Sequence, residues 1–76
     1  MKFADAYAST DQAAGYAYVH DEDGQELVAA GKLEESLRFF RQACRIADAA
    51  YLSDASKALF RGHRDAIEAA LGLTRE

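Results

Sequence analysis

The stretch KLEESLRFFRQACRIADAAY, residues 32–51, decides the fold of this chain. It contains neither glycine nor proline, and one set of residues recurs along it at spacings of 4, 3, 4, 3 and 4. These residues are Leu33, Leu37, Phe40, Cys44, Ala47 and Tyr51. Because an α-helix turns once every ~3.6 residues, this spacing places all of them on one face. We therefore predict a helix over residues 32–51.

A second row of mostly apolar residues lies beside the first on the same helix. It consists of Ser36, Phe39, Ala43, Ile46 and Ala50. Together the two rows widen the apolar arc to about 180° of the helix surface, more than one neighbouring helix covers. We expect this helix either to lie at the centre, with neighbours on two sides, or to keep apolar surface for another chain. A homodimer formed through Phe39, Ile46 and their neighbours is one form of the second alternative.

Another helix is predicted from Ser53 or Asp54 to Gly72. Serine and aspartate are favoured N-caps, and glycine is favoured just beyond a helix C-terminus. The apolar face of this helix carries Leu59, Phe60, Ala66, Ile67, Ala70 and Leu71. His63 lies in the middle of that face, and we interpret it as a core residue rather than a ligand. Gly62 costs about 1 kcal/mol relative to alanine inside a helix, which the close approach of another backbone or a kink would offset.

The first third of the chain fits two structures. The sequence STDQ at residues 9–12 fits a capping box and predicts a helix through about His20. The segments on either side of Asp23 and Gly24 fit a β-hairpin equally well, with a third strand from Lys2 to Tyr7. A lone hairpin is marginally stable and the rest of the chain is helical. We therefore predict a mainly α fold, a small three-helix domain; the alternative is an α+β fold with an N-terminal hairpin or small antiparallel sheet packed on two helices.

Size and composition indicate one small globular domain spanning residues 1–76. Half of the residues are apolar and 29% are charged, a balance typical of neither a disordered chain nor a membrane protein. No apolar run is long enough to span a membrane, and residues 1–5 lack the apolar segment of a secretory signal. Cys44 is the single cysteine, so an internal disulfide is excluded and a reducing compartment is favoured. We predict a cytoplasmic protein without a membrane partner.

The net charge of −4 is unevenly distributed. Residues 1–38 carry eight acidic and three basic residues, a net −5, whereas residues 39–76 carry five acidic and six basic residues, a net +1. An acidic first half favours basic partners and disfavours nucleic acid in that region.

The stretch VHDEDGQE at residues 19–26 places five candidate metal ligands within eight residues. A calcium loop of the EF-hand kind needs ligands at positions 1, 3 and 5, glycine at 6 and glutamate at 12. With Gly24 at position 6, the first and last positions are Val19 and Ala30, neither of which supplies a side-chain ligand. We interpret the stretch as a solvated acidic turn.

Other site chemistry is equally absent from the sequence. His20, His63 and Cys44 lack the local spacing of zinc ligands, so we predict no metal site. The chain has no glycine-rich phosphate loop, no Gly-x-Ser-x-Gly elbow and no Cys-x-x-Cys pair. A nucleophile pair of Cys44 and His63 would have to line an accessible cleft, yet both positions predict burial. We predict a protein without catalytic activity or cofactor.

Residues 31–43 resemble the second helix of a tetratricopeptide repeat. The matching positions are Gly31 and Leu33 at the turn, Ser36 and Ala43 as the small residues, and Phe40 as the aromatic. Upstream, Gly24 and Leu27 fall where the first helix has its glycine and aromatic, but His20 stands at the tryptophan-type position. Downstream, residues 62–67 are one residue short of the turn of the repeat, and no proline closes either unit. The resemblance covers 13 of 76 residues and implies a protein-interaction scaffold.

The charge asymmetry, together with the lack of site chemistry, predicts a regulator or inhibitor that docks on a basic protein surface, as small phage inhibitors of nucleic-acid-handling machines do. The residues predicted to bind the partner are Asp21, Glu22, Asp23, Glu26, Glu34 and Glu35.

The alternative function is nucleic-acid binding by two basic rows on the two helices. These rows consist of Arg38, Arg41, Arg45, Lys57, Arg61 and Arg64. Acidic residues interrupt both rows, and the sequence pI is near 5.0, whereas nucleic-acid-binding domains are usually basic. The nucleic-acid hypothesis is therefore the second choice.

Overall fold

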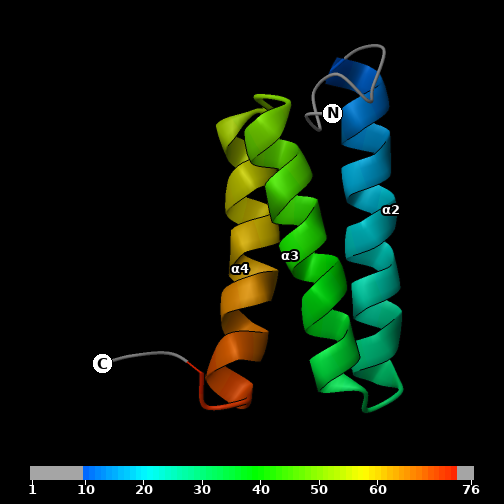
Figure 1. Cartoon of the computed structure of the whole chain (residues 1–76), viewed down its shortest axis with the longest axis vertical. Coiled ribbons are helices and arrows are strands. Elements are labelled where there is room, and N and C mark those ends of the chain that lie inside the picture. The colour runs from blue at the N-terminus through cyan, green and yellow to red at the C-terminus, as the bar shows by residue number, and fades with distance from the viewer. Residues whose placement is uncertain (1–9, 74–76) are drawn as a thin grey trace.

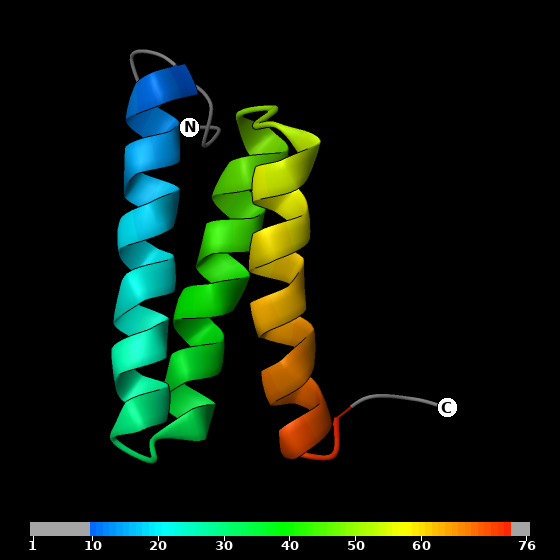
Figure 2. The ribbon, with the colours of Figure 1, turned by 180° about the vertical axis from the view of Figure 1, so that it is seen from behind.

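Three helices make up residues 10–73, the part of the chain that the computed structural model describes. Helix α2 comprises Thr10–Ala29, α3 comprises Leu33–Ala49 and α4 comprises Asp54–Ala70. They run antiparallel in sequence order, with α3 between α2 and α4 (Figures 1 and 2). The predicted mainly α three-helix domain is confirmed. The hairpin alternative is wrong, because residues 10–73 contain no strand, and the third strand proposed from Lys2 to Tyr7 lies outside the described residues.

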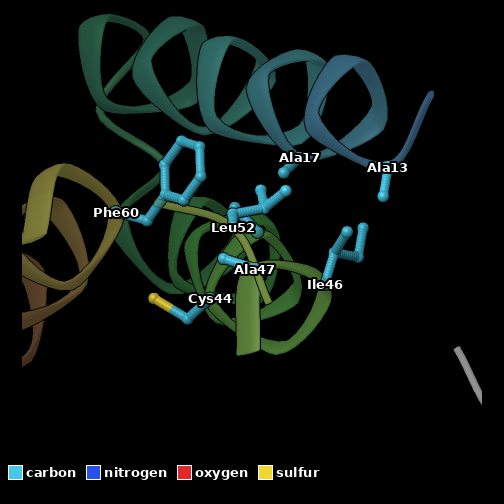
Figure 3. Packing of buried hydrophobic residues seen from close by; sticks show 8 residues of the cluster. Ala13, Ala17, Cys44, Ile46, Ala47, Leu52 and Phe60 are labelled. Carbon is cyan, nitrogen blue, oxygen red and sulfur yellow. The ribbon is translucent and has the colours of Figure 1, made fainter. Parts of the chain in front are cut away.

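The central helix α3 buries most of its two apolar rows within the chain, whereas Tyr51, just beyond its end, is exposed. Ala13 of α2 faces Ile46 of α3, Ala17 lies beside Leu52, and Phe60 of α4 reaches across towards α2 (Figure 3). The broad apolar arc is therefore covered by two neighbouring helices, the first of the two predicted alternatives. Ile46 is 0% exposed. Ile46 therefore has no surface left for a second copy, whereas Phe39 is partly exposed, and a homodimer formed through Phe39 and its neighbours stays a prediction.

A stripe of small residues joins α2 to α3. Ala13, Ala17, Asp21 and Gly24 are all buried, at spacings of 4, 4 and 3. A Cβ atom added to Gly24 would lie 2.6 Å from the Phe40 ring, so glycine is what lets the two helices approach this closely. The interpretation of residues 19–26 as a solvated acidic turn is wrong, because these residues lie inside α2, and Asp21 and Gly24 among them are buried.

All three helices end in the same hydrogen-bonded turn. After α2, the N–H of Lys32 donates to the carbonyl of Leu27 at 2.9 Å while Gly31 has a φ of +77°. The end of α4 repeats this arrangement around Gly72, with a φ of +73°. This is the Schellman motif, whose left-handed position favours glycine. After α3, that position is occupied by Tyr51, with a φ of +55°, so a bulky side chain adopts a conformation that disfavours it.

The start of α4 agrees with the predicted cap. The Oγ atom of Ser53 accepts a hydrogen bond from the N–H of Ser56 at 3.2 Å. This bond satisfies one of the N–H groups that a helix N-terminus leaves without an intrahelical acceptor.

Candidate functional site

A buried carboxylate and a histidine connect α2 to α4. The side chain of Asp21 is 2% exposed, and its Oδ1 and Oδ2 atoms lie 2.8 Å and 2.9 Å from Nδ1 of His63. The Nε2 atom of Gln25, one turn further along α2, donates to Oδ2 at 2.8 Å. Every described buried side-chain nitrogen or oxygen has a hydrogen-bond partner, so this polar group is accommodated without an unsatisfied atom.

The carboxylate fixes the orientation of the His63 ring. Because a carboxylate only accepts hydrogen bonds, Nδ1 carries the hydrogen and donates it to Asp21. The side chain of His63 is 33% exposed, and Nε2 is its remaining polar atom. Enzymes and metal sites orient histidines in the same way, with a carboxylate on one ring nitrogen and the reactive position on the other. The hydrogen bond to Asp21 therefore orients the His63 imidazole. The side chains around Nε2 determine whether it can act in catalysis or in binding.

His63 lines a shallow groove of about 350 Å³ on one side of the molecule, which we call the α2–α4 groove. Its lining residues are Gln25, Val28, Ala29, Phe40, His63, Ala66 and Ile67. The Phe40 and His63 rings lie 5.5 Å apart between centroids. None of the seven lining residues carries a hydroxyl, thiol or amine, so the groove holds no side-chain nucleophile for the imidazole to activate. The apolar lining is suited to binding rather than to covalent chemistry.

The three residues considered for zinc lie at separate places. His20 donates from Nδ1 to the carbonyl of Tyr16 at 2.9 Å and faces the Phe39 ring, whereas His63 faces Asp21. Cys44 is 4% exposed, and burial raises the pKa of its thiol above the ordinary value despite the nearby Arg64 guanidinium. Among residues 10–73, no group of three or more His, Cys, Asp or Glu side chains is placed to hold a metal ion.

The six predicted partner-binding carboxylates fall into two groups. Asp21 is buried and bonded to His63, so it does not belong to an exposed acidic surface, and its assignment as a docking residue is corrected here. Asp23 is partly exposed, and the other four are exposed: Glu22, Glu26, Glu34 and Glu35. None of these five forms an ion pair with any residue in the range 10–73. Glu22 and Glu26 stand one turn apart on the face of α2 that points away from the core stripe.

Half of the residues in the two basic rows, in contrast, are paired with carboxylates of α3 or α4. Arg41 pairs with Glu68 at 3.0 Å and Arg61 with Asp48 at 3.1 Å, each joining α3 to α4. Arg64 pairs with Asp65 at 2.9 Å within α4. The remaining basic residues of the two rows are Arg38, Arg45 and Lys57, which have no ion pair within the described part of the chain. The predicted nucleic-acid face is therefore a mixed surface rather than a continuous basic one.

No protein family, curated protein or solved structure matches this chain. Its resemblance to a tetratricopeptide repeat stays a prediction, although α2 and α3 do form an antiparallel pair with Gly31 in the turn. Within residues 10–73, no helix is both long and apolar enough to cross a membrane.

Sequence reasoning missed the Asp21–His63 bridge and the contribution of Gln25. One signal was present in the sequence, because Ala13, Ala17, Asp21 and Gly24 share one helical face and His63 interrupts an apolar face. A polar residue in the middle of each core-facing stripe indicates that the two are paired with each other. That inference requires knowing that residues 10–29 form one helix, which the sequence left open.

Proposed function

We propose that this protein is a non-enzymatic, cytoplasmic regulator or inhibitor that binds a basic surface of another protein through the outward-facing carboxylates of its first half. One observation carries the proposal. Apart from the buried Asp21–His63 pair, every ion pair of the described residues lies on α4 or between α3 and α4, whereas Glu22, Asp23, Glu26, Glu34 and Glu35 have none. These five carboxylates, all in the first half of the chain, are thus left without an ion pair among the described residues.

The physical role of such a surface is to steer and orient a partner. Exposed ion pairs contribute about 0.2–1 kcal/mol each to stability, so no single carboxylate dominates the affinity. An uncompensated patch nevertheless raises the rate of encounter with a basic protein and selects against acidic ones. Because the Debye length at physiological salt is about 8 Å, binding through this patch weakens as salt is added.

The test is a capture experiment with the full chain on beads, in a cell lysate split into nuclease-treated and untreated halves. The variant Glu22→Gln/Glu26→Gln removes two negative charges from α2. Its matched control, Ala55→Lys/Ala58→Lys, changes the net charge by the same amount at two exposed positions of α4. We expect a protein partner that survives nuclease treatment, is lost with the α2 variant and is retained with the α4 control.

Two results would contradict the proposal. Equal loss of the partner in both variants would mean that only the net charge matters. Partners that disappear with nuclease, together with recovered nucleic acid and a gel shift at low salt, would instead assign binding to the basic rows. Reduced gel shifts in variants of Arg38, Arg45 and Lys57, the three without ion pairs, would locate that site.

A further inference from the structure

We propose that the α2–α4 groove is the docking site for an amphipathic helix of the partner protein, with an apolar stripe and a flank of lysine or arginine. This inference rests on the proposed function and specifies the contact element of the partner. Three features of the molecule support it: an open side of the bundle, an oriented polar residue in the groove, and the charge of the flanking helix.

The three-helix arrangement leaves one side open. Both α2 and α4 pack mainly against α3 rather than against each other. The lining of the resulting groove is mostly apolar, with Val28 and Ala29 from α2, Phe40 from α3, and Ala66 and Ile67 from α4. An amphipathic helix laid in such a groove completes a four-helix arrangement, which is a recurring mode of peptide recognition.

The groove is organised before a partner arrives. The hydrogen bonds from His63 and Gln25 to the buried Asp21 hold two lining side chains in place. Side chains that are already ordered lose less conformational entropy on binding, which favours affinity. The Nε2 atom of His63 is left to bond a polar group of the occupant, which would fix its register along the groove.

Gly62 has no role within the chain that explains its presence. No atom lies within 4 Å of the position of its missing Cβ, so the predicted close approach of another backbone does not occur inside this molecule. A glycine inside a helix costs about 1 kcal/mol relative to alanine. Ala58 and Ala66, one turn to either side, are exposed and also small. Gly62 is not among the lining residues of the α2–α4 groove, so it is not part of the proposed docking site.

The negative charge beside the groove determines which partner helix can bind. Glu22 and Glu26 lie on exposed α2 surface next to the groove residue Gln25 and have no ion pair within residues 10–73. A basic flank on the occupant complements them, and an acidic flank is repelled.

The test uses two synthetic helical peptides of about 18 residues, long enough for five turns. Both carry leucines at helical spacing, and the remaining positions are lysine in one and glutamate in the other. Each is titrated into the ¹⁵N-labelled full chain. We expect the lysine peptide to shift the amide signals of Gln25, Val28, Ala29 and His63 saturably, and less at high salt, while the glutamate peptide leaves them unchanged.

One matched pair of variants locates the contact. Ala66→Gln places a long side chain in the groove, and we expect it to weaken binding of the lysine peptide about tenfold, equivalent to about 1.4 kcal/mol. The matched control Ala55→Gln makes the same change on exposed α4 surface, about three turns from Ala66, and should leave the affinity within about twofold. Circular-dichroism melts establish that both variants fold.

The possible failures are distinguishable. Full binding by Ala66→Gln, with loss in Glu22→Gln/Glu26→Gln, would overturn the groove and leave the acidic-surface proposal intact. Shifts that map outside the groove, or equal shifts with both peptides, would also overturn it. Concentration-dependent dimerisation in sedimentation, with groove amides shifting on dilution, would assign the groove to a second copy and contradict the partner helix.

Discussion

Helices α2 and α3 pack against each other by opposite means. Helix α3 presents large apolar side chains at regular spacing, among them Leu37, Phe40 and Ile46. Helix α2 presents a stripe of small residues with a carboxylate in its middle, and its apolar residues show little segregation to one face. The comparison shows that small side chains can also hold a helix in place, because they allow the neighbouring helix to approach closely. The predictions below test this difference, from the largest expected effect to the smallest.

Removing a large core side chain should have the largest effect. Phe60 is fully buried and meets the Tyr18 ring of α2 edge-on, with centroids 4.9 Å apart. We expect Phe60→Ala to lower the free energy of unfolding by about 3–5 kcal/mol, a large share of the stability of a domain this size. Urea denaturation measures it. Leu59→Ala, at a half-exposed neighbour, is the control; equal losses in the two variants would show that Phe60 does not anchor α2.

Replacing a glycine inside a helix by alanine usually stabilises a protein. At Gly24, in the stripe of small residues on α2, we expect the opposite. The Cβ atom in Gly24→Ala would lie 2.6 Å from the Phe40 ring, so we expect a loss of about 1–3 kcal/mol from overpacking. Gly15→Ala on the same helix meets no atom within 4 Å and should stabilise the protein by about 0.5–1 kcal/mol. Thermal or urea melts of the two variants should therefore move in opposite directions; a shift in the same direction would refute the close packing.

Removing His63 from the buried bridge should lower the free energy of unfolding more than removing Asp21. His63→Ala leaves the buried Asp21 carboxylate with Gln25 as its remaining side-chain donor, and we expect a loss of about 1–2 kcal/mol. Asp21→Ala removes the buried acid itself and extends the alanine stripe, so we expect a change below about 1 kcal/mol. The double variant should recover most of the loss caused by His63→Ala. Additive losses in this double-mutant cycle would mean that the two residues do not interact.

The turn after α3 should become more stable when glycine is placed at its left-handed position. The turns after α2 and α4 already have glycine there. Tyr51 is 84% exposed and occupies the left-handed position that Gly31 and Gly72 hold elsewhere. We expect Tyr51→Gly to stabilise the protein by about 1 kcal/mol, since glycine adopts this conformation without a steric cost. Gly31→Ala and Gly72→Ala should each destabilise it, as melting curves will show. A loss of stability in Tyr51→Gly would indicate that the tyrosine ring contributes more than its backbone strain costs.

The smallest expected effect concerns the Cys44 thiol on α3. Burial raises the pKa of this thiol above its ordinary value of 9.0, so the folded state retains the proton at pH values where the unfolded state loses it. Its contribution to stability is therefore fully present below the ordinary pKa and is lost as pH rises through the folded pKa. We expect the urea midpoint of the unmodified protein to fall more steeply above about pH 8.5 than that of Cys44→Ala. Parallel profiles would contradict this.

The different success of prediction for the helices has a physical cause. The rows from Leu33 to Ala50 gave the bounds of α3 closely, and the cap at Ser53 and the glycine at 72 gave those of α4. Large apolar residues at helical spacing can be buried together in few ways, so they identify a helix locally. Alanine, glycine and aspartate fit a helix, a strand end or a turn, so the segment from Gly15 to Gly24 remained ambiguous.

The sequence by itself determined the helical class, the central position available to α3, the cap of α4 and the charge difference between the two halves. The tertiary structure decided that Asp21 is buried, that its partner is His63 42 residues away, and that Gly24 receives the Phe40 ring. It also decided which charges are compensated, because Arg41 and Arg61 find their partners on another helix. Local spacing fixes which residues share a face, but only the packing of one face on another determines which residues meet.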